Sequence, residues 1–169
     1  LESCVISDAY GGEKFGRGVY YRMVYGAENE DQKQEVILVF EEQLIINTVG
    51  KAMGIKTNKL ESKLIHATRY TAQQFVGRVL EQFPTTEAYK LKEENLLSYE
   101  EFQKLIENEK MQVSLLFNTG AGYFAYCVIA PHLLEKGVGT PIEKENALTE
   151  VEEYLMKREK QEVSNQKSK

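Results

Sequence analysis

The longest regular pattern of apolar positions in the chain extends from Asn58 to Phe83. Within it, apolar side chains and one threonine recur every three or four residues, which is the period of an α-helix. These positions are Leu60, Leu64, Ile65, Ala67, Thr71, Ala72, Phe75, Val76, Val79, Leu80 and Phe83. The opposite side of the predicted helix carries His66, Arg69, Tyr70, Gln73, Gln74 and Arg78. Asn58 and Glu61 have capping-box spacing at its start, and Pro84 follows its end.

Shorter segments with alternating or continuous apolar residues predict β-strands. Two of them flank the polar loop 27–33 and are expected to pair as an antiparallel hairpin. A second hairpin is predicted around the turn Asn118–Gly122, and its contiguous Leu115–Phe117 run suggests the most deeply buried part of the sheet. The predicted strands cover residues 1–7, 16–25, 34–40, 88–92, 111–118 and 123–130.

Three further helices are predicted, at Glu41–Met53, Tyr99–Glu109 and Thr140–Lys160. Gly54 is placed to end the first in a left-handed conformation. Ser98 and Glu101 form a capping box before the second. Thr140 and Pro141 suit the cap and first position of the third, which carries a narrow apolar stripe.

This order of elements predicts an α+β fold. We expect an antiparallel or mixed sheet of about six strands, with two long central helices packed on one face, plus a C-terminal helical tail. Residues 1–131 would form the α+β domain. Residues 132–169 would form a linker, an amphipathic helix and a disordered polar tail.

The composition limits the classes of partner that this chain is expected to bind. The chain has 169 residues, a formal net charge of −5 and a pI near 5.3. This balance argues against nucleic acid or an anionic membrane as the main partner, because both are usually bound by basic surfaces. No apolar run is long enough to span a membrane, and the two cysteines form no disulfide framework. We therefore expect a cytoplasmic location without membrane insertion.

Candidate chemistry is sparse. The two histidines are far apart without a zinc-like pattern, and the glycine clusters lack the phosphate-loop lysine, so neither a metal nor a cofactor is expected. Ten tyrosines are present, and Tyr10, Tyr20, Tyr21, Tyr25 and Tyr123 lie near the predicted strands. They suit either an association surface on an edge strand or ordinary packing within the sheet.

Three segments resemble the CheC/CheX/FliY family of chemotaxis phosphatases, and CheX most closely. They are "QEVILVFEEQLIINTVGKAM" at residues 34–53, the long helix Asn58–Phe83, and "MQVSLLFNTGAGYFAYCVIA" at residues 111–130. The resemblance extends over roughly Gly16 to Ala130. It implies an α+β scaffold whose long helix faces a phosphorylated receiver domain.

In that family the helix presents a Glu, two residues and then an Asn, whose amide orients the water that attacks the aspartyl phosphate. Placing the family's helix glycine on Gly77 puts these two positions at Tyr70 and Gln73. Tyr70 supplies no carboxylate, Gln73 is one methylene longer than Asn, and Arg69 stands where the family has a small residue. A 1 Å displacement can cost about a hundredfold in rate, so standard phosphatase activity is not expected.

Two functional hypotheses follow. The first is a non-catalytic CheX-like interaction domain in chemotaxis or two-component signalling, with Arg69, Tyr70, Gln73 and Gln74 as its binding surface. Its partner would be the receiver domain of a response regulator, another signalling protein or a second copy in a homodimer. The alternative is an atypical phosphatase of a phosphorylated response regulator, in which Gln73 orients water as glutamine does in some GTPases. A binding or structural α+β domain outside this family also remains open.

Overall fold

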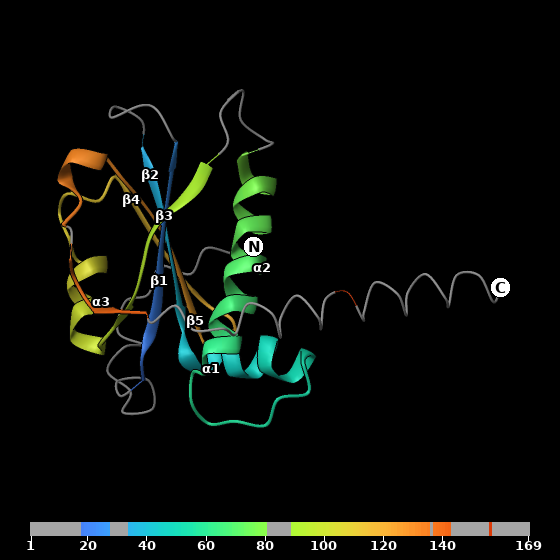
Figure 1. The fold of residues 1–169 in the computed structure, drawn as a ribbon. Coiled ribbons are helices and arrows are strands. Elements are labelled where there is room, and N and C mark those ends of the chain that lie inside the picture. Colours follow the sequence, from blue (N-terminus) through green and yellow to red (C-terminus); the bar gives the residue numbers. More distant parts are fainter. Residues whose placement is uncertain (1–17, 28–33, 81–88, 136, 143–155, 157–169) are drawn as a thin grey trace.

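The computed structural model describes residues 18–27, 34–80, 89–135, 137–142 and 156 (Figure 1). These residues form an α+β fold around a six-stranded sheet whose neighbouring strands are all antiparallel. The strand order is β4-β5-β2-β1-β3-β6. The bounds are Tyr20–Ala27 for β1, Glu35–Glu41 for β2, Tyr89–Leu97 for β3, Val113–Asn118 for β4, Tyr123–Ile129 for β5 and Thr140–Pro141 for β6.

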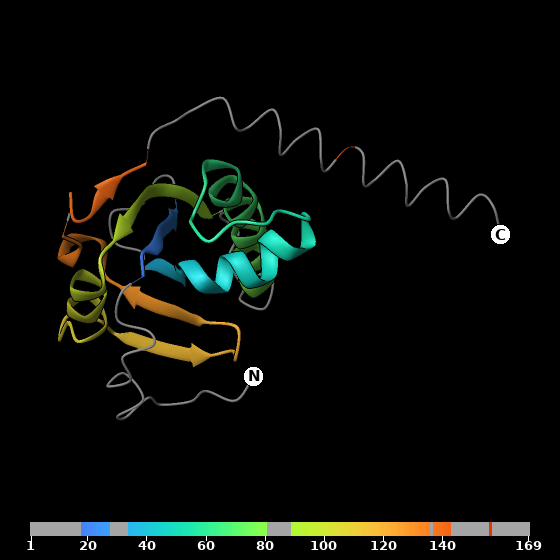
Figure 2. The same cartoon turned by 90° about the horizontal axis from the view of Figure 1, so that it is seen from below.

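Helices cover both faces of the sheet (Figures 1 and 2). On one face lie α1 (Glu42–Ile45), the π-helix η2 (Ile46–Gly50) and α2 (Ser62–Leu80). On the other lie α3 (Tyr99–Ile106) and the 3-10 turn η3 (Pro131–Leu133). Two long central helices were expected, but only α2 is long, with 19 residues. The helix α1 has four residues and η2 has five. None of the described helices is long and apolar enough to cross a membrane.

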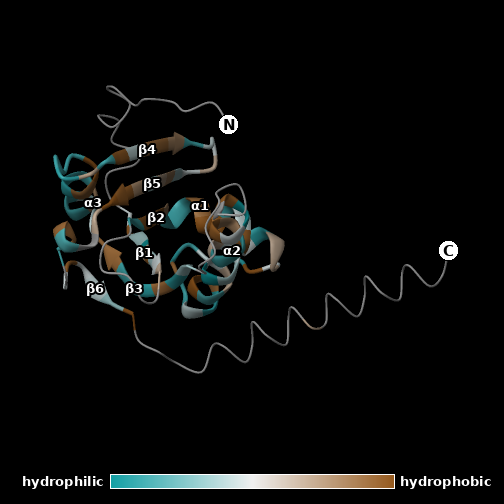
Figure 3. Cartoon of the chain, turned by 90° about the horizontal axis from the view of Figure 1, so that it is seen from above, coloured by the Kyte–Doolittle hydropathy of each residue, from teal (hydrophilic) through white to brown (hydrophobic). Residues whose placement is uncertain are grey.

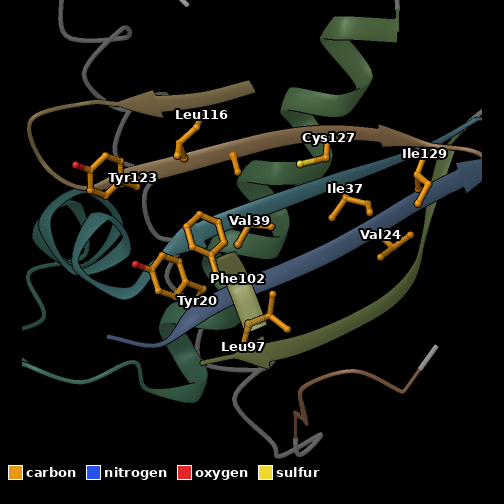
Figure 4. Packing of buried hydrophobic residues seen from close by; sticks show 11 residues of the cluster. Tyr20, Val24, Ile37, Val39, Leu97, Phe102, Leu116, Tyr123, Cys127 and Ile129 are labelled. Atoms are coloured by element: carbon orange, nitrogen blue, oxygen red, sulfur yellow. The ribbon is translucent and has the colours of Figure 1, made fainter. Parts of the chain in front are cut away.

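Strand β1 lies inside the sheet and contributes to two separate hydrophobic clusters, because alternate residues of a strand point to opposite faces. Tyr20 and Val24 face α3, and the Tyr20 ring stacks on Phe102 with centroids 4.1 Å apart (Figure 4). Tyr21 and Met23 pack toward α2. All eight residues of β1 are buried, so it is the most deeply buried strand. The described tyrosines predicted in this strand and Tyr123 are therefore packing residues, while Tyr10 lies outside the described residues.

The last hairpin is less buried than its sequence predicts. Figure 3 shows that β4 and β5 are mainly apolar, but β4 is an outer strand of the sheet. Only Leu116 of β4 is buried, and Leu115 and Phe117 are half-buried. A contiguous apolar run predicts that side chains on both faces of the strand are buried. β4 is an edge strand with a neighbouring strand on one side only, so its side chains have fewer neighbours and stay partly exposed.

The start of α2 is also different from the prediction. The helix begins at Ser62, so Asn58 is not its cap. Instead, the Glu42 carboxylate at the start of α1 accepts a hydrogen bond of 2.9 Å from the Leu60 amide. Two local predictions are confirmed: Gly54 has φ 70°, and the Ser98–Glu101 capping box opens α3.

The other edge of the sheet corrects two further predictions. Strand β3 continues to Leu97, beyond the predicted end at residue 92. Thr140 and Pro141 do not start a helix but pair with β3 as β6, opposite Leu96 and Asn95. From residue 143 onward, the predicted C-terminal helix and polar tail lie outside the described residues, apart from Met156, which is helical. The predicted strand at 1–7 lies outside them as well.

Candidate functional site

The outer side of α2 carries the residues predicted as a binding surface, but they do not form one surface. The Tyr70 side chain is 51% exposed, and Gln73 and Gln74 are exposed as well. Arg69 is half-buried and directed toward β3. Only part of the predicted surface is therefore available to a partner.

Arg69 is held in an internal polar cluster with Glu94 of β3. Its Nε donates a hydrogen bond of 2.8 Å to Glu94 Oε2, and its Nη2 donates to Glu94 Oε1, which makes the ion pair bidentate. The Tyr21 hydroxyl donates to the same carboxylate from β1. Burial, followed by this hydrogen bond, raises the pKa of Tyr21, so the phenol stays protonated. The cluster of Arg69, Glu94 and Tyr21 therefore joins α2 to β3 and β1.

His66 belongs to the same cluster and is only 6% exposed. Its Nδ1 lies 2.8 Å from Arg69 Nη1. Since a guanidinium can only donate, Nδ1 accepts, and the ring is neutral with its proton on Nε2. Burial and the nearby Arg69 charge both lower the pKa of His66, in agreement with this state. Nε2 is buried and has no hydrogen-bond partner among the described residues.

His66 and Arg69, which the sequence places on the same side of the helix as Tyr70, are largely buried against β3. Their spacing correctly predicts the side of the helix on which they lie. On that side β3 runs next to α2, and its residue Glu94 binds Arg69. The polar flank of α2 is therefore a buried contact with the sheet. The sequence signal was present in Glu93–Asn95, three polar residues that follow the predicted strand and remain within β3.

Gln73 is engaged with the backbone of β3. Its Nε2 donates a hydrogen bond of 3.2 Å to the carbonyl oxygen of Tyr89. An amide that orients an attacking water must present a polar group to that water, and here the donor side is turned to the protein. No group of three or more His, Cys, Asp or Glu among the described residues is arranged to hold a metal ion.

The other flank of α2 borders an apolar groove of about 530 Å³. Its floor contains Phe40, Phe117 and Phe124, whose rings lie in contact, with centroids 4.9 Å apart for Phe40–Phe124 and 5.6 Å for Phe117–Phe124. Phe75 of α2 meets Phe124 edge to face at 5.8 Å. In Figures 2 and 3, β4 extends beyond the part of the sheet that α1 and α2 cover.

The groove has helical walls on both sides. Thr68, Thr71, Ala72, Phe75 and Val79 form the wall from α2, and Leu44, Ile45, Thr48 and Val49 form the wall from α1 and η2. Thr48 and Val49 lie in the π-helical turn, a conformation that is frequent at functional sites. The apolar stripe of α2 predicts packing against the sheet along the whole helix. The signal against this was Thr71, which falls in the stripe and is exposed.

Comparison of the chain with protein-family models, curated proteins and solved structures finds no match. The CheX-like resemblance therefore stays a prediction.

Proposed function

We propose that this chain is a non-catalytic interaction domain of chemotaxis or two-component signalling, acting in the cytoplasm, and that its partner is a receiver domain. The observation that carries the proposal is Tyr70, which is 51% exposed at the middle of α2, on the solvent side of a helix whose other flank borders the apolar groove. Tyrosine is among the residues that most often anchor protein interfaces, because it offers a large apolar body and a polar tip. The resemblance to CheX supplies the class of partner.

The contact surface follows from the geometry of α2. Tyr70 and Gln74 lie on its exposed side, and Thr71 is exposed at the rim of the groove. A partner helix that presents apolar side chains three and four residues apart would fill the groove while its polar side meets Gln74. Arg69 would act indirectly, because its ion pair with Glu94 holds α2 in place on the sheet.

We propose that the domain is non-catalytic because of the residues at Tyr70 and Gln73, the two positions that correspond to the family's catalytic pair. Tyr70 has no carboxylate to anchor a receiver lysine, and the Gln73 amide donates to Tyr89. Both side chains lie on the exposed part of α2, but Tyr70 lacks the carboxylate of the pair and the Gln73 amide is turned toward β3.

The test is a binding titration against a panel of receiver domains, each with and without beryllofluoride as the phosphoryl mimic. We expect saturable binding to at least one receiver, and Tyr70→Ala should weaken it by about tenfold or more, the effect typical of an interface anchor. Thr71→Glu should weaken it as well, by placing a charge at the apolar rim. Glu107→Ala is the matched control, because Glu107 is exposed at the end of α3 on the opposite face.

Two results would overturn the proposal. One is that no receiver binds and sedimentation velocity shows only self-association, which would make a second copy the partner. The other is that the protein accelerates loss of phosphate from a receiver and Gln73→Ala abolishes this effect. That outcome would establish the alternative, an atypical phosphatase.

A further inference from the structure

The two edges of the sheet differ in how they are protected. At one edge, β6 pairs with β3 through only two residues, Thr140 and Pro141, and a proline has no backbone N–H to offer a further strand. The other edge is β4, whose one neighbour in the described sheet is β5 (Figure 2). Proteins usually shorten an edge strand or place charges, prolines or bulges on it, because open edges pair with other strands.

Strand β4 carries none of these protective features. Its six residues contain no charge and no proline, and they pair with β5 without a register shift. Val113 is 40% exposed, and Leu115 and Phe117, on the same side of the strand, are half-buried. The strand is therefore an open and largely apolar edge that can accept a further strand.

The turn between β4 and β5 determines which backbone groups a further strand would meet. The Thr119 amide donates to the Gly122 carbonyl oxygen at 3.1 Å, so these two residues belong to a hydrogen-bonded pair. Along antiparallel strands such pairs alternate with non-hydrogen-bonded pairs, whose N–H and C=O groups point away from the partner strand. Ser114 and Leu116 therefore direct these groups outward, whereas Leu115 directs them to β5.

The chain itself contains a segment whose sequence suits this edge. The strand predicted at residues 1–7, outside the described residues, has three consecutive apolar residues, Cys4, Val5 and Ile6. Valine and isoleucine are among the residues most enriched in strands. Cys4 and Ile6 would share one face of such a strand and Val5 would lie on the other, so either face offers an apolar contact to the partly exposed side chains of β4.

The chain between this segment and β1 is long enough to reach the edge. Tyr20 begins β1 at the same end of the sheet as Asn118, the last residue of β4, as the register of the intervening strands shows. Four strand spacings of about 4.8 Å, or about 19 Å in all, separate β1 from a strand placed outside β4. Residues 8–19 form the connection, and at about 3.3 Å per residue they can span about 40 Å.

We propose that residues 1–7 pair with β4 as a seventh strand of the sheet. Tethering favours this segment over a second copy of the chain, because a short flexible connection gives an effective concentration of about millimolar. The added strand lies beside Phe117 and extends the floor of the groove that Phe117 lines. The proposal does not rest on receiver binding, because it concerns the edge of the sheet and not the exposed side of α2.

The test is amide hydrogen exchange of the full chain, followed residue by residue by NMR. We expect slow exchange at the outward-facing amides of Ser114 and Leu116, because the added strand accepts their hydrogen bonds. The Leu115 amide bonds to β5 and should be protected with or without the added strand, so it reports that the sheet is folded. Fast exchange at Ser114 and Leu116 beside a protected Leu115 would overturn the proposal.

A double variant identifies the segment that protects these amides. Val5→Pro/Ile6→Pro removes a donor to β4 in either register, because neighbouring residues of a strand direct their N–H groups to opposite sides. It should speed exchange at the two outward-facing amides by about tenfold or more. Glu13→Pro/Lys14→Pro, in the connection, is the matched control and should leave their exchange unchanged.

Protection of the outward-facing amides that survives Val5→Pro/Ile6→Pro would refute the assignment. Sedimentation velocity of the same sample then names the occupant, because a dimer would place a second copy at the edge of β4. A monomer whose amides lose protection in this variant alone is the result expected from pairing within one chain.

Discussion

Replacing Glu94 by glutamine tests whether the polar flank of α2 is structural. The Glu94 carboxylate accepts hydrogen bonds from Arg69 and Tyr21, and joins α2 to β3 and β1. Glutamine has nearly the same size but no charge, and its NH2 group opposes the Arg69 donors. The Glu94→Gln variant therefore leaves a largely buried guanidinium without its counter-ion.

The expected loss follows from the burial of the pair. The Glu94 and Arg69 side chains are 16% and 22% exposed. Removing one partner of a fully buried pair costs about 3–5 kcal/mol, whereas a surface pair contributes about 0–1 kcal/mol. We expect an intermediate loss in the free energy of unfolding, about 2–3 kcal/mol. With a urea m-value of about 1–3 kcal/mol/M, this lowers the midpoint of urea unfolding by roughly 0.7–3 M.

The assay is urea unfolding followed by far-UV circular dichroism, with Glu61→Gln as the control. Glu61 pairs with Lys63 at 3.4 Å, and the side chains of these two residues are 44% and 35% exposed, so its loss should be below about 0.5 kcal/mol. The double variant Arg69→Met/Glu94→Leu should regain part of the lost stability, because it removes both charges. If Glu94→Gln loses no more stability than Glu61→Gln, the cluster is not structural and Arg69 is available to a partner.

Three further perturbations test the fold. Gly122→Ala should lower the free energy of unfolding by about 2–4 kcal/mol, because φ is 151° and a Cβ would lie 2.6 Å from a backbone nitrogen of α1. Gly120→Ala is the control, because the space around Gly120 is open, and it should lower the free energy of unfolding by only about 1 kcal/mol in the same urea measurement. Ser98→Ala should lose about 1 kcal/mol by removing the cap of α3, and an unchanged thermal midpoint would contradict this. His66 is neutral in the folded state and its pKa is lowered by burial, so the unfolded chain binds more protons and stability should fall as pH drops below about 6.5. Urea unfolding between about pH 5 and 8 should show this slope, His66→Gln should reduce it, and His132→Gln, at an exposed position, should not.

Much of the secondary structure could be predicted from local sequence. The strands β1, β2, β4 and β5 and the helix α2 have their own apolar periodicity, and the cap of α3 is set by two residues three positions apart. These signals are local because the period of a strand or helix is fixed by its backbone geometry. The extent of β3 was not predictable in this way. Glu94 and Asn95 are tolerated there because their partners come from distant elements.

The site shows the same division. The sequence indicated that Tyr70 and Gln74 would be exposed, and they are. It could not indicate that Gln73 donates to Tyr89, or that Phe75 borders a groove. Both depend on which part of the sheet α2 covers, and that is decided by the strand order.

The sequence by itself therefore determined which residues share a side of α2 and which segments form strands. Only the tertiary structure decided what each side meets. One flank of α2 meets β3 through the Arg69–Glu94 ion pair, the other borders the groove, and Tyr70 remains toward solvent. The physical reason is that periodicity is a property of one element, whereas burial depends on neighbours that are far away in the chain.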